Sequence, residues 1–244
     1  MQTECAVKES GEIAVNKYFM VADILEASKN NGRLMPIGKT YDCKTFWDGL
    51  GQDYFKRFKK KEHFQVNVAW IIDRLKILKL KTLLDAGCGF GRVAPFLLDA
   101  GVIEKIDGFD IAPSILKSSE EYLAEEEKEE GKEVAPNFKD KISLSEGDVR
   151  AIKLDSGSYD VVLSCELLQH ISPEDVEDAV RELVRVAKKA IIFVERWSFP
   201  NEHSEPHMWS HNIGEILTKL GVRVEQVTPI NSGVNGILAL KQYI

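Results

Sequence analysis

The sequence has no long hydrophobic segment, no paired cysteine motif and no excess of basic residues. No apolar run approaches the roughly 20 residues that span a bilayer, which argues against a membrane protein. The first residues lack the basic and apolar regions of a signal peptide. The 4 cysteines include no C-x-x-C pair, so neither a zinc cluster nor a disulfide framework is indicated. We therefore expect a reduced, cytoplasmic protein.

Acidic side chains outnumber basic ones. The chain of 244 residues has 39 Asp and Glu against 32 Lys and Arg, a net charge of −7. Such a balance disfavours broad electrostatic binding to nucleic acid or to an anionic membrane. Because 44% of the residues are hydrophobic and 29% are charged, the chain can bury a sizeable core, and general disorder is not expected.

From residue 81 onward, short apolar runs alternate with amphipathic segments. We expect strands over 81–86, 105–110, 141–146, 159–164 and 190–195, and helices over 92–99, 113–128, 173–188 and 211–220. This alternation predicts an α/β fold with a doubly wound, mostly parallel sheet and helices on both faces. Two last runs, 222–227 and 236–241, lie too close together for a helix between them. They predict an antiparallel C-terminal hairpin that completes a seven-stranded sheet.

The segment before this alternation has a different composition. Its aromatic residues cluster between positions 41 and 58, where they are interrupted by glycines at 49 and 51: Tyr41, Phe46, Trp47, Tyr54, Phe55 and Phe58. We expect an N-terminal arm over 1–62, helical in part, with one helix over 13–30. A second domain over 63–244 would begin with a helix over 63–78.

A glycine-rich loop follows the first expected strand. It reads Asp85-Ala-Gly-Cys-Gly-Phe-Gly-Arg92, and its glycines let the backbone approach a ligand closely. The G-x-G-x-G spacing is one residue shorter than the dinucleotide motif G-x-G-x-x-G. Asp110 ends the second expected strand, 19 residues after Gly91, where a carboxylate can accept both hydroxyls of a ribose. The loop alone is also compatible with a tight strand-to-helix turn.

The ordered set of motifs resembles the class I S-adenosylmethionine-dependent methyltransferases. It comprises residues 85–91, 108–116, 147–149 and 158–166, and the resemblance covers about residues 64–244. The resemblance implies a Rossmann-like fold, an enzyme that transfers methyl groups, and S-adenosyl-L-methionine as cofactor with S-adenosyl-L-homocysteine as product. The Asn/Asp-Pro-Pro-Tyr motif, with which the family methylates amino groups of bases or glutamine, is absent, and Ser164-Cys-Glu-Leu167 stands in its place. We therefore expect an O or N atom of a small molecule or an exposed peptide group as acceptor.

The resemblance also implies roles for individual residues. The glycine loop, with Asp85, would hold the amino-acid part of the cofactor, and it contributes Gly87, Cys88, Gly89, Gly91 and Arg92. Asp110 would bind the ribose, and Ile111 would lie against the adenine. Asp148 would accept from the adenine amino group beside Val149, although it could instead simply cap a turn. Cys165 would lie near the methionine portion, although a buried small apolar residue is the alternative.

Candidate acceptor-side residues lie at the end of the fourth strand and after the fifth. Leu167 and His170 would border the acceptor pocket, with Trp197 and Trp209 as walls. Glu195, His207 or His211 could act as general base. His203, His207 and His211 have the spacing of four that a helical metal site uses, but Pro200 and Pro206 interrupt the stretch, so we assign no metal. The alternative is a surface loop in which Ser210 or His211 caps the next helix.

The N-terminal arm offers a further wall. In many relatives this segment covers the cofactor, so Trp47 and Tyr54 could contact the sulfonium through their ring faces. Packing of the arm onto the core is the alternative. Two other function classes stay open. One is a nicotinamide-dependent oxidoreductase, which the shorter glycine loop and the terminal hairpin disfavour, and the other is a subunit that binds the cofactor without catalysis.

Overall fold

The computed structural model describes residues 41–60, 64–128, 137–196, 207–231 and 233–241, all of which lie within one compact unit, Ile37–Ile244. The predicted helix over 13–30, Trp197 and His203 lie outside the described residues. In the described ranges, no helix has both the length and the apolar character needed to cross a membrane.

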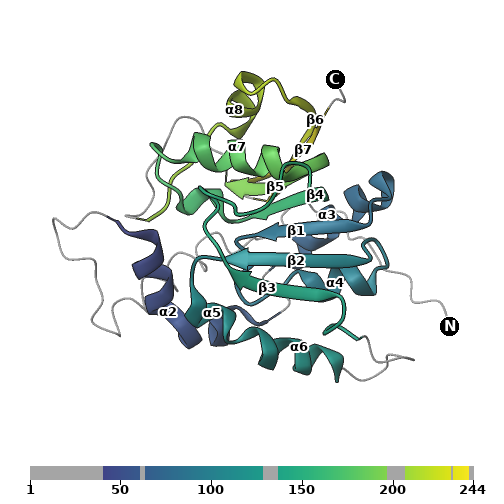
Figure 1. Ribbon diagram of the computed structural model, residues 1–244, viewed down its shortest axis with the longest axis vertical. Coiled ribbons are helices and arrows are strands. Elements are labelled where there is room, and N and C mark those ends of the chain that lie inside the picture. The colour runs from purple at the N-terminus through teal and green to yellow at the C-terminus, as the bar shows by residue number, and fades with distance from the viewer. Residues whose placement is uncertain (1–40, 61–63, 129–136, 197–206, 232, 242–244) are drawn as a thin grey trace, which may run out of the picture. The chain divides into compact units, whose positions relative to one another are not determined.

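The described chain is built on a seven-stranded sheet of order β3-β2-β1-β4-β5-β7-β6 (Figure 1). Its strands are β1 (Thr82–Ala86), β2 (Lys105–Asp110), β3 (Ile142–Glu146), β4 (Tyr159–Cys165), β5 (Ala187–Arg196), β6 (Arg223–Asn231) and β7 (Val234–Leu240). The first five strands pair in parallel, whereas β7 pairs antiparallel with both β5 and β6. The predicted doubly wound sheet with an antiparallel C-terminal hairpin is therefore confirmed.

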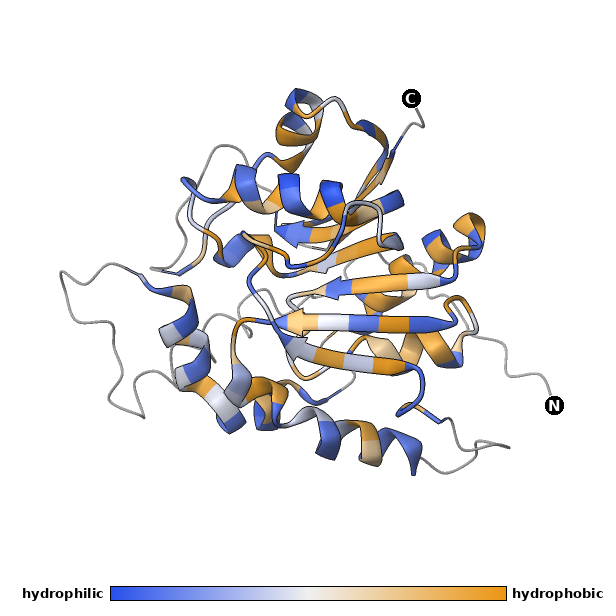
Figure 2. Cartoon of the chain, in the orientation of Figure 1, coloured by the Kyte–Doolittle hydropathy of each residue, from blue (hydrophilic) through white to orange (hydrophobic). Residues whose placement is uncertain are grey.

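Helices cover both faces of the sheet because neighbouring strand residues point to opposite sides. Leu83 packs in one apolar cluster with α3 (Gln65–Leu78) and α4 (Ala94–Asp99), on the side that α6 (Ser119–Glu127) also contacts. Leu84 packs in the other cluster, with α7 (Val176–Val186) and α8 (Ile213–Lys219). Because both faces are buried, the central strands are apolar along most of their length (Figure 2).

Two predicted helices differ from those in the structure by more than two residues at an end. The single helix expected over 113–128 is divided into α5 (Pro113–Leu116) and α6, because Ser118, which is buried, makes a tight turn by donating its N–H to the carbonyl of Ile115 at 3.0 Å. The helix expected from 173 begins at Val176, since Ser172 starts a turn rather than capping the helix directly. It ends at Val186 because β5 follows at once.

Helix α2 (Cys43–Phe58) lies beyond the carboxyl ends of the parallel strands (Figure 1). Asp42 caps it by accepting from the N–H of Thr45 at 2.7 Å. The helix continues through the predicted interruption with a kink at Gly51, whose φ of 45° suits glycine. The side chain and backbone of Asp48 accept from Ser114 N–H at 2.8 Å and its Oγ at 2.7 Å, which holds α2 against α5. The predicted domain boundary at residues 62 and 63 stays a prediction.

Candidate functional site

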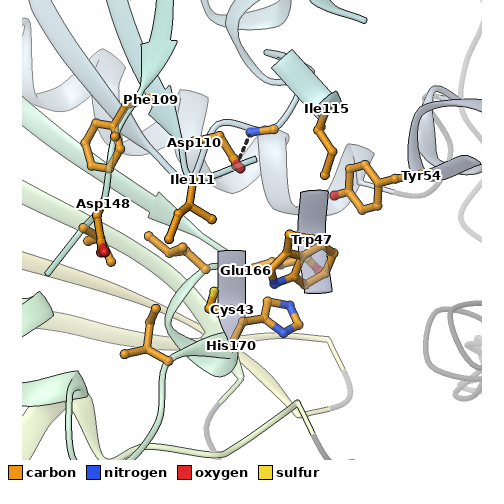
Figure 3. A pocket seen from close by; sticks show the side chains of 16 residues that line it. Cys43, Trp47, Tyr54, Phe109, Asp110, Ile111, Ile115, Asp148, Glu166 and His170 are labelled. Atoms are coloured by element: carbon orange, nitrogen blue, oxygen red, sulfur yellow. Dashed lines mark hydrogen bonds between the residues drawn. The ribbon is translucent and has the colours of Figure 1, made fainter. Parts of the chain in front are cut away.

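A cavity that is open to solvent lies between α2 and the carboxyl ends of β1, β2, β3 and β4 (Figure 3). Such ends are where open α/β sheets bind ligands. Its lining combines three stretches that are distant in the sequence: Cys43, Trp47 and Tyr54 of α2; Gly87, Gly89, Phe109, Asp110, Ile111 and Ile115; and Gly147, Asp148, Val149, Glu166, Leu167, His170 and Ile171.

The glycine loop forms one side of this cavity, and its conformation requires glycine. Gly87 has a φ of +69°, and a Cβ there would lie 2.6 Å from Cδ1 of Leu167. Gly91 has a φ of +82°, and a Cβ there would lie 2.8 Å from Cδ1 of Leu144. The loop is tied to β2 because the carbonyl of Phe109 accepts from the N–H of Gly87 at 2.8 Å. A residue with a Cβ at either position would therefore overlap with a neighbouring leucine side chain.

Asp110 is fixed beside the glycine loop. Its two oxygens accept from the N–H groups of Gly89 and Ala112, each at 2.9 Å. Burial raises the pKa of Asp110 above its ordinary value, although these backbone hydrogen bonds oppose the shift. The carboxyl group therefore lines the cavity at a defined position, where it can accept further hydrogen bonds.

A smaller cavity adjoins the first and contains the side chains of two acidic residues and one basic residue, Asp85, Glu166 and Arg92. Nη2 of Arg92 lies 2.5 Å from Oε2 of Glu166, and the two side chains are only 10% and 11% exposed. Glu166 has a φ of 58°, which a non-glycine residue rarely adopts. Burial raises the pKa of Asp85 to about 7, against the opposing charge of Arg92. Cys165, also on this cavity, has its thiol pKa raised by burial and by the adjacent Glu166.

The opposite side of the main cavity is aromatic. The ring of Trp47 lies 4.5 Å from that of His170, edge to face. Nδ1 of His170 is 3.1 Å from the carbonyl oxygen of His207, which only accepts, so Nδ1 carries the proton. Nε2 then accepts from the amide nitrogen of Gln169 at 3.2 Å. Burial and the neighbouring His207 lower the pKa of His170 to about 3, so this wall is neutral.

The residues predicted as general bases do not line the cavity in the described part of the chain. Glu195, 1% exposed, accepts from Oγ of Ser164 at 2.7 Å and from the N–H groups of Leu167 and Leu168 at 3.2 and 3.0 Å. His211 directs Nε2 to the carbonyl of Ile171 at 2.9 Å, and Asn212 instead caps α8. Their catalytic role stays a prediction.

Two further predicted acceptor-side residues lie behind the aromatic wall. His207 stacks on Phe46 with ring centroids 4.5 Å apart, and Trp209 lies edge to face with Tyr41 at 5.4 Å. The described residues include no cluster of three or more His, Cys, Asp or Glu that could hold a metal ion.

Several lining residues were not predicted. Cys43 is one, although its spacing of four from Trp47 places both on one side of a helix, which could have indicated it. Glu166 follows the predicted Cys165 and lies on both cavities, with a left-handed backbone that the sequence does not indicate. Ile115 and Ile171 gave no sequence signal beyond being apolar.

Comparisons with known proteins agree with this geometry. Residues 84–194 match the family described as "Methyltransferase domain". Norajmaline N-methyltransferase and ajmaline N-methyltransferase, both of Rauvolfia serpentina, are 28% and 30% identical over 109 and 113 residues, which is 45% of this chain in each case. The matched stretch spans only 33% of the length of each of these two relatives.

Solved structures share the fold. A SAM-dependent methyltransferase from Aquifex aeolicus has a TM-score of 0.59 at 17% identity, covering 82% of this chain and 99% of its own. Magnesium protoporphyrin IX methyltransferase from Synechocystis PCC 6803, with bound SAH, has a TM-score of 0.64 at 16% identity, covering 82% and 100%. The matched family therefore describes residues 84–194 of this chain, and the solved structures share the fold of its described residues.

Proposed function

We propose that the protein transfers a methyl group from S-adenosyl-L-methionine to an O or N atom of a small molecule or an exposed peptide group, with an amine nitrogen as the favoured acceptor. The observation that carries this proposal is the cavity itself. It brings the glycine loop, Asp110 and Asp148 to one side and an aromatic, neutral wall to the other.

The residues that line the two cavities fit S-adenosyl-L-methionine as the cofactor. The space beside Gly87 and Gly89, which a side chain at Gly87 would obstruct, suits the amino-acid part, with Asp85 and Arg92 in the adjoining cavity as partners of opposite charge. Asp110 would hold the ribose hydroxyls. When bound, the cofactor supplies an electrophilic methyl group on a sulfonium.

Asp148 and three apolar side chains would hold the purine. Ile111, Phe109 and Val149 line the same cavity as Asp148 and can pack against a planar ring. Cys43 lies on the same cavity, and burial raises the pKa of its thiol, which keeps that group protonated and uncharged.

The acceptor wall favours an amine. Both ring nitrogens of His170 are engaged in hydrogen bonds, and its lowered pKa keeps it neutral, so its ring can contact an acceptor but cannot take its proton. A neutral amine attacks through its lone pair and loses a proton only afterwards, so no base has to act first. Two of the curated relatives are named N-methyltransferases, which supports the same choice.

Calorimetric binding of S-adenosylmethionine, S-adenosylhomocysteine and NAD tests the cofactor. We expect the two S-adenosyl compounds to bind and NAD not to bind, and Asp110→Ala to weaken binding at least about tenfold, since it removes charge-assisted hydrogen bonds. Asp73→Ala, which removes an exposed carboxylate on α3, is the matched control. Tight binding of NAD, or no binding of either sulfur compound, would overturn the assignment.

Turnover with a panel of amines and alcohols tests the acceptor. Formation of S-adenosylhomocysteine that depends on an amine supports the proposal, and dependence on hydroxyl compounds alone would assign the acceptor atom to oxygen. The second candidate function is a subunit that binds the cofactor without catalysis. Cofactor binding without turnover on any acceptor would favour it.

A further inference from the structure

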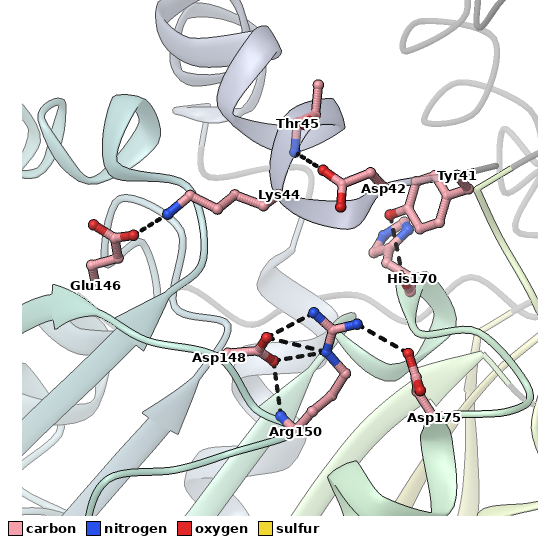
Figure 4. Close-up of polar contacts among 9 residues, drawn as sticks. All are labelled: Tyr41, Asp42, Lys44, Thr45, Glu146, Asp148, Arg150, His170 and Asp175. Carbon is pink, nitrogen blue, oxygen red and sulfur yellow. Dashed lines mark hydrogen bonds and ion pairs between the residues drawn. The ribbon is translucent and has the colours of Figure 1, made fainter. Parts of the chain in front are cut away.

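Arg150 folds back onto the carboxylate of Asp148, which lines the cavity (Figure 4). Its backbone N–H lies 2.9 Å from Oδ1, and its Nη2 lies 2.7 Å from Oδ2. Its Nε is shared between the two oxygens, at 3.0 and 3.2 Å. The remaining end of the guanidinium, Nη1, donates to Asp175 just before α7, at 3.0 Å. Arg150 is therefore held by two carboxylates.

These contacts fix the plane of the Asp148 carboxylate. An ionised carboxylate offers about four acceptor sites, and three donors from Arg150 occupy most of them. The fork of the guanidinium matches a carboxylate in only a few orientations, so the group cannot turn freely. Burial raises the pKa of Asp148, but the hydrogen bonds and charge of Arg150 outweigh this and lower it below its ordinary value. Asp148 thus presents a fixed, acceptor-only edge to the cavity.

We propose that Arg150 is a positioning residue that makes the cavity select a 6-aminopurine over a 6-oxopurine. The inference rests on the proposed function, because it places the purine at Asp148. A 6-amino group donates a hydrogen bond to the fixed carboxylate. A 6-oxo group would place its oxygen, a hydrogen-bond acceptor, next to a carboxylate oxygen of Asp148, which is also an acceptor. Because Arg150 holds the carboxylate, it cannot rotate away to relieve the repulsion.

The test compares binding of S-adenosylhomocysteine with binding of S-inosylhomocysteine by calorimetry. We expect the wild type to prefer the adenosyl compound at least about tenfold, as for a hydrogen bond to a charged group. Arg150→Gln should reduce this preference about threefold to fivefold, the range for a partly exposed ion pair. Asp148→Asn should abolish the preference, since an amide can turn either its oxygen or its NH₂ group toward the purine.

Arg181→Gln is the matched control. Arg181 also lies between two carboxylates, Glu177 at 2.8 Å and Asp178, but on the exposed side of α7 and off the cavity lining. The substitution removes the same charge and should leave the preference unchanged. If Arg150→Gln does not fold, as judged by urea unfolding, Arg150→Lys replaces it, because lysine keeps the charge but lacks the fork.

The outcomes separate the two proposals. If the Arg150 variant keeps the wild-type preference for the adenosyl compound, the inference is overturned. This includes the case in which both compounds bind more weakly by the same factor, because a merely structural role would produce that result. Wild-type binding of both compounds with no preference also overturns it, while leaving the proposed function intact. Failure of the wild type to bind S-adenosylhomocysteine overturns the proposed function itself.

Discussion

Substitution of Gly87 by alanine should both destabilise the protein and obstruct the cavity. The backbone has a φ of +69°, and the added Cβ would lie 2.6, 3.0 and 3.1 Å from three carbons of Leu167. The left-handed conformation costs an L residue about 1 to 2 kcal/mol. Relief of the overlap with Leu167 adds about 1 to 3 kcal/mol. We expect a loss of about 2 to 5 kcal/mol in the free energy of unfolding.

Gly157 provides the control for the backbone contribution. It has the same φ of +69°, but a Cβ there meets nothing within 4 Å. Gly157→Ala should therefore lose only about 1 to 2 kcal/mol. The double variant Gly87→Ala/Leu167→Ala is compared with Leu167→Ala alone. The difference in their free energies of unfolding shows what Gly87→Ala costs when the Leu167 side chain is no longer there to overlap with the added Cβ.

Urea unfolding measures these differences, and calorimetry with S-adenosylhomocysteine measures the obstruction. Because Leu167 lines the cavity, its displacement should weaken binding in Gly87→Ala and not in Gly157→Ala. If Gly87→Ala is no more destabilising than Gly157→Ala, the contact with Leu167 does not constrain the loop and our reasoning is wrong.

Three further predictions concern the two cavities. The folded-state pKa of Asp85, about 7, lies above its ordinary 3.8, so between about pH 4 and 7 the folded state binds a proton that the unfolded state does not. The wild-type free energy of unfolding should therefore fall as pH rises through this window, by about 2 to 4 kcal/mol more than that of Asp85→Asn. Urea unfolding at several pH values measures both, and the same dependence of unfolding free energy on pH in the two proteins would contradict the prediction. Arg92→Met should destabilise by about 3 to 5 kcal/mol because it leaves Glu166 buried without its partner, and adding Glu166→Gln should recover part of the loss. Trp47→Ala should raise the acceptor KM about tenfold through loss of the ring against His170, whereas Trp209→Ala, off the cavity lining, should change it less.

Much of the fold could be predicted because the signals are local. The predicted strand over 105–110 has the same bounds in the structure, because the short run that forms it ends clearly at Asp110. The hairpin follows from a connection too short for a helix. The break after Leu116 was not predicted, because it depends on how Ser118 and Tyr122 are buried against the rest of the core.

The site was less predictable because it depends on contacts between distant segments. The glycine loop and Asp110 could be found by motif. Helix α2 contacts the rest of the chain through pairs such as Asp48 with Ser114 and Lys44 with Glu146, which no spacing in the sequence reveals. Glu195 is a second example. Its residue type suits a general base, but the sequence does not reveal that its oxygens accept hydrogen bonds from Ser164 and from backbone N–H groups.

Part of the cavity wall lies outside the stretch that matches the family, and this has an evolutionary consequence. The family match covers residues 84–194, whereas Cys43, Trp47 and Tyr54 precede it. Substitutions in the earlier stretch can alter what enters the cavity while the glycine loop and Asp110 stay unchanged. Under the proposed function, new acceptors could thus be acquired by exchanging one short helix, and grafting residues 41–60 between homologous enzymes becomes a practical way to re-engineer their selectivity.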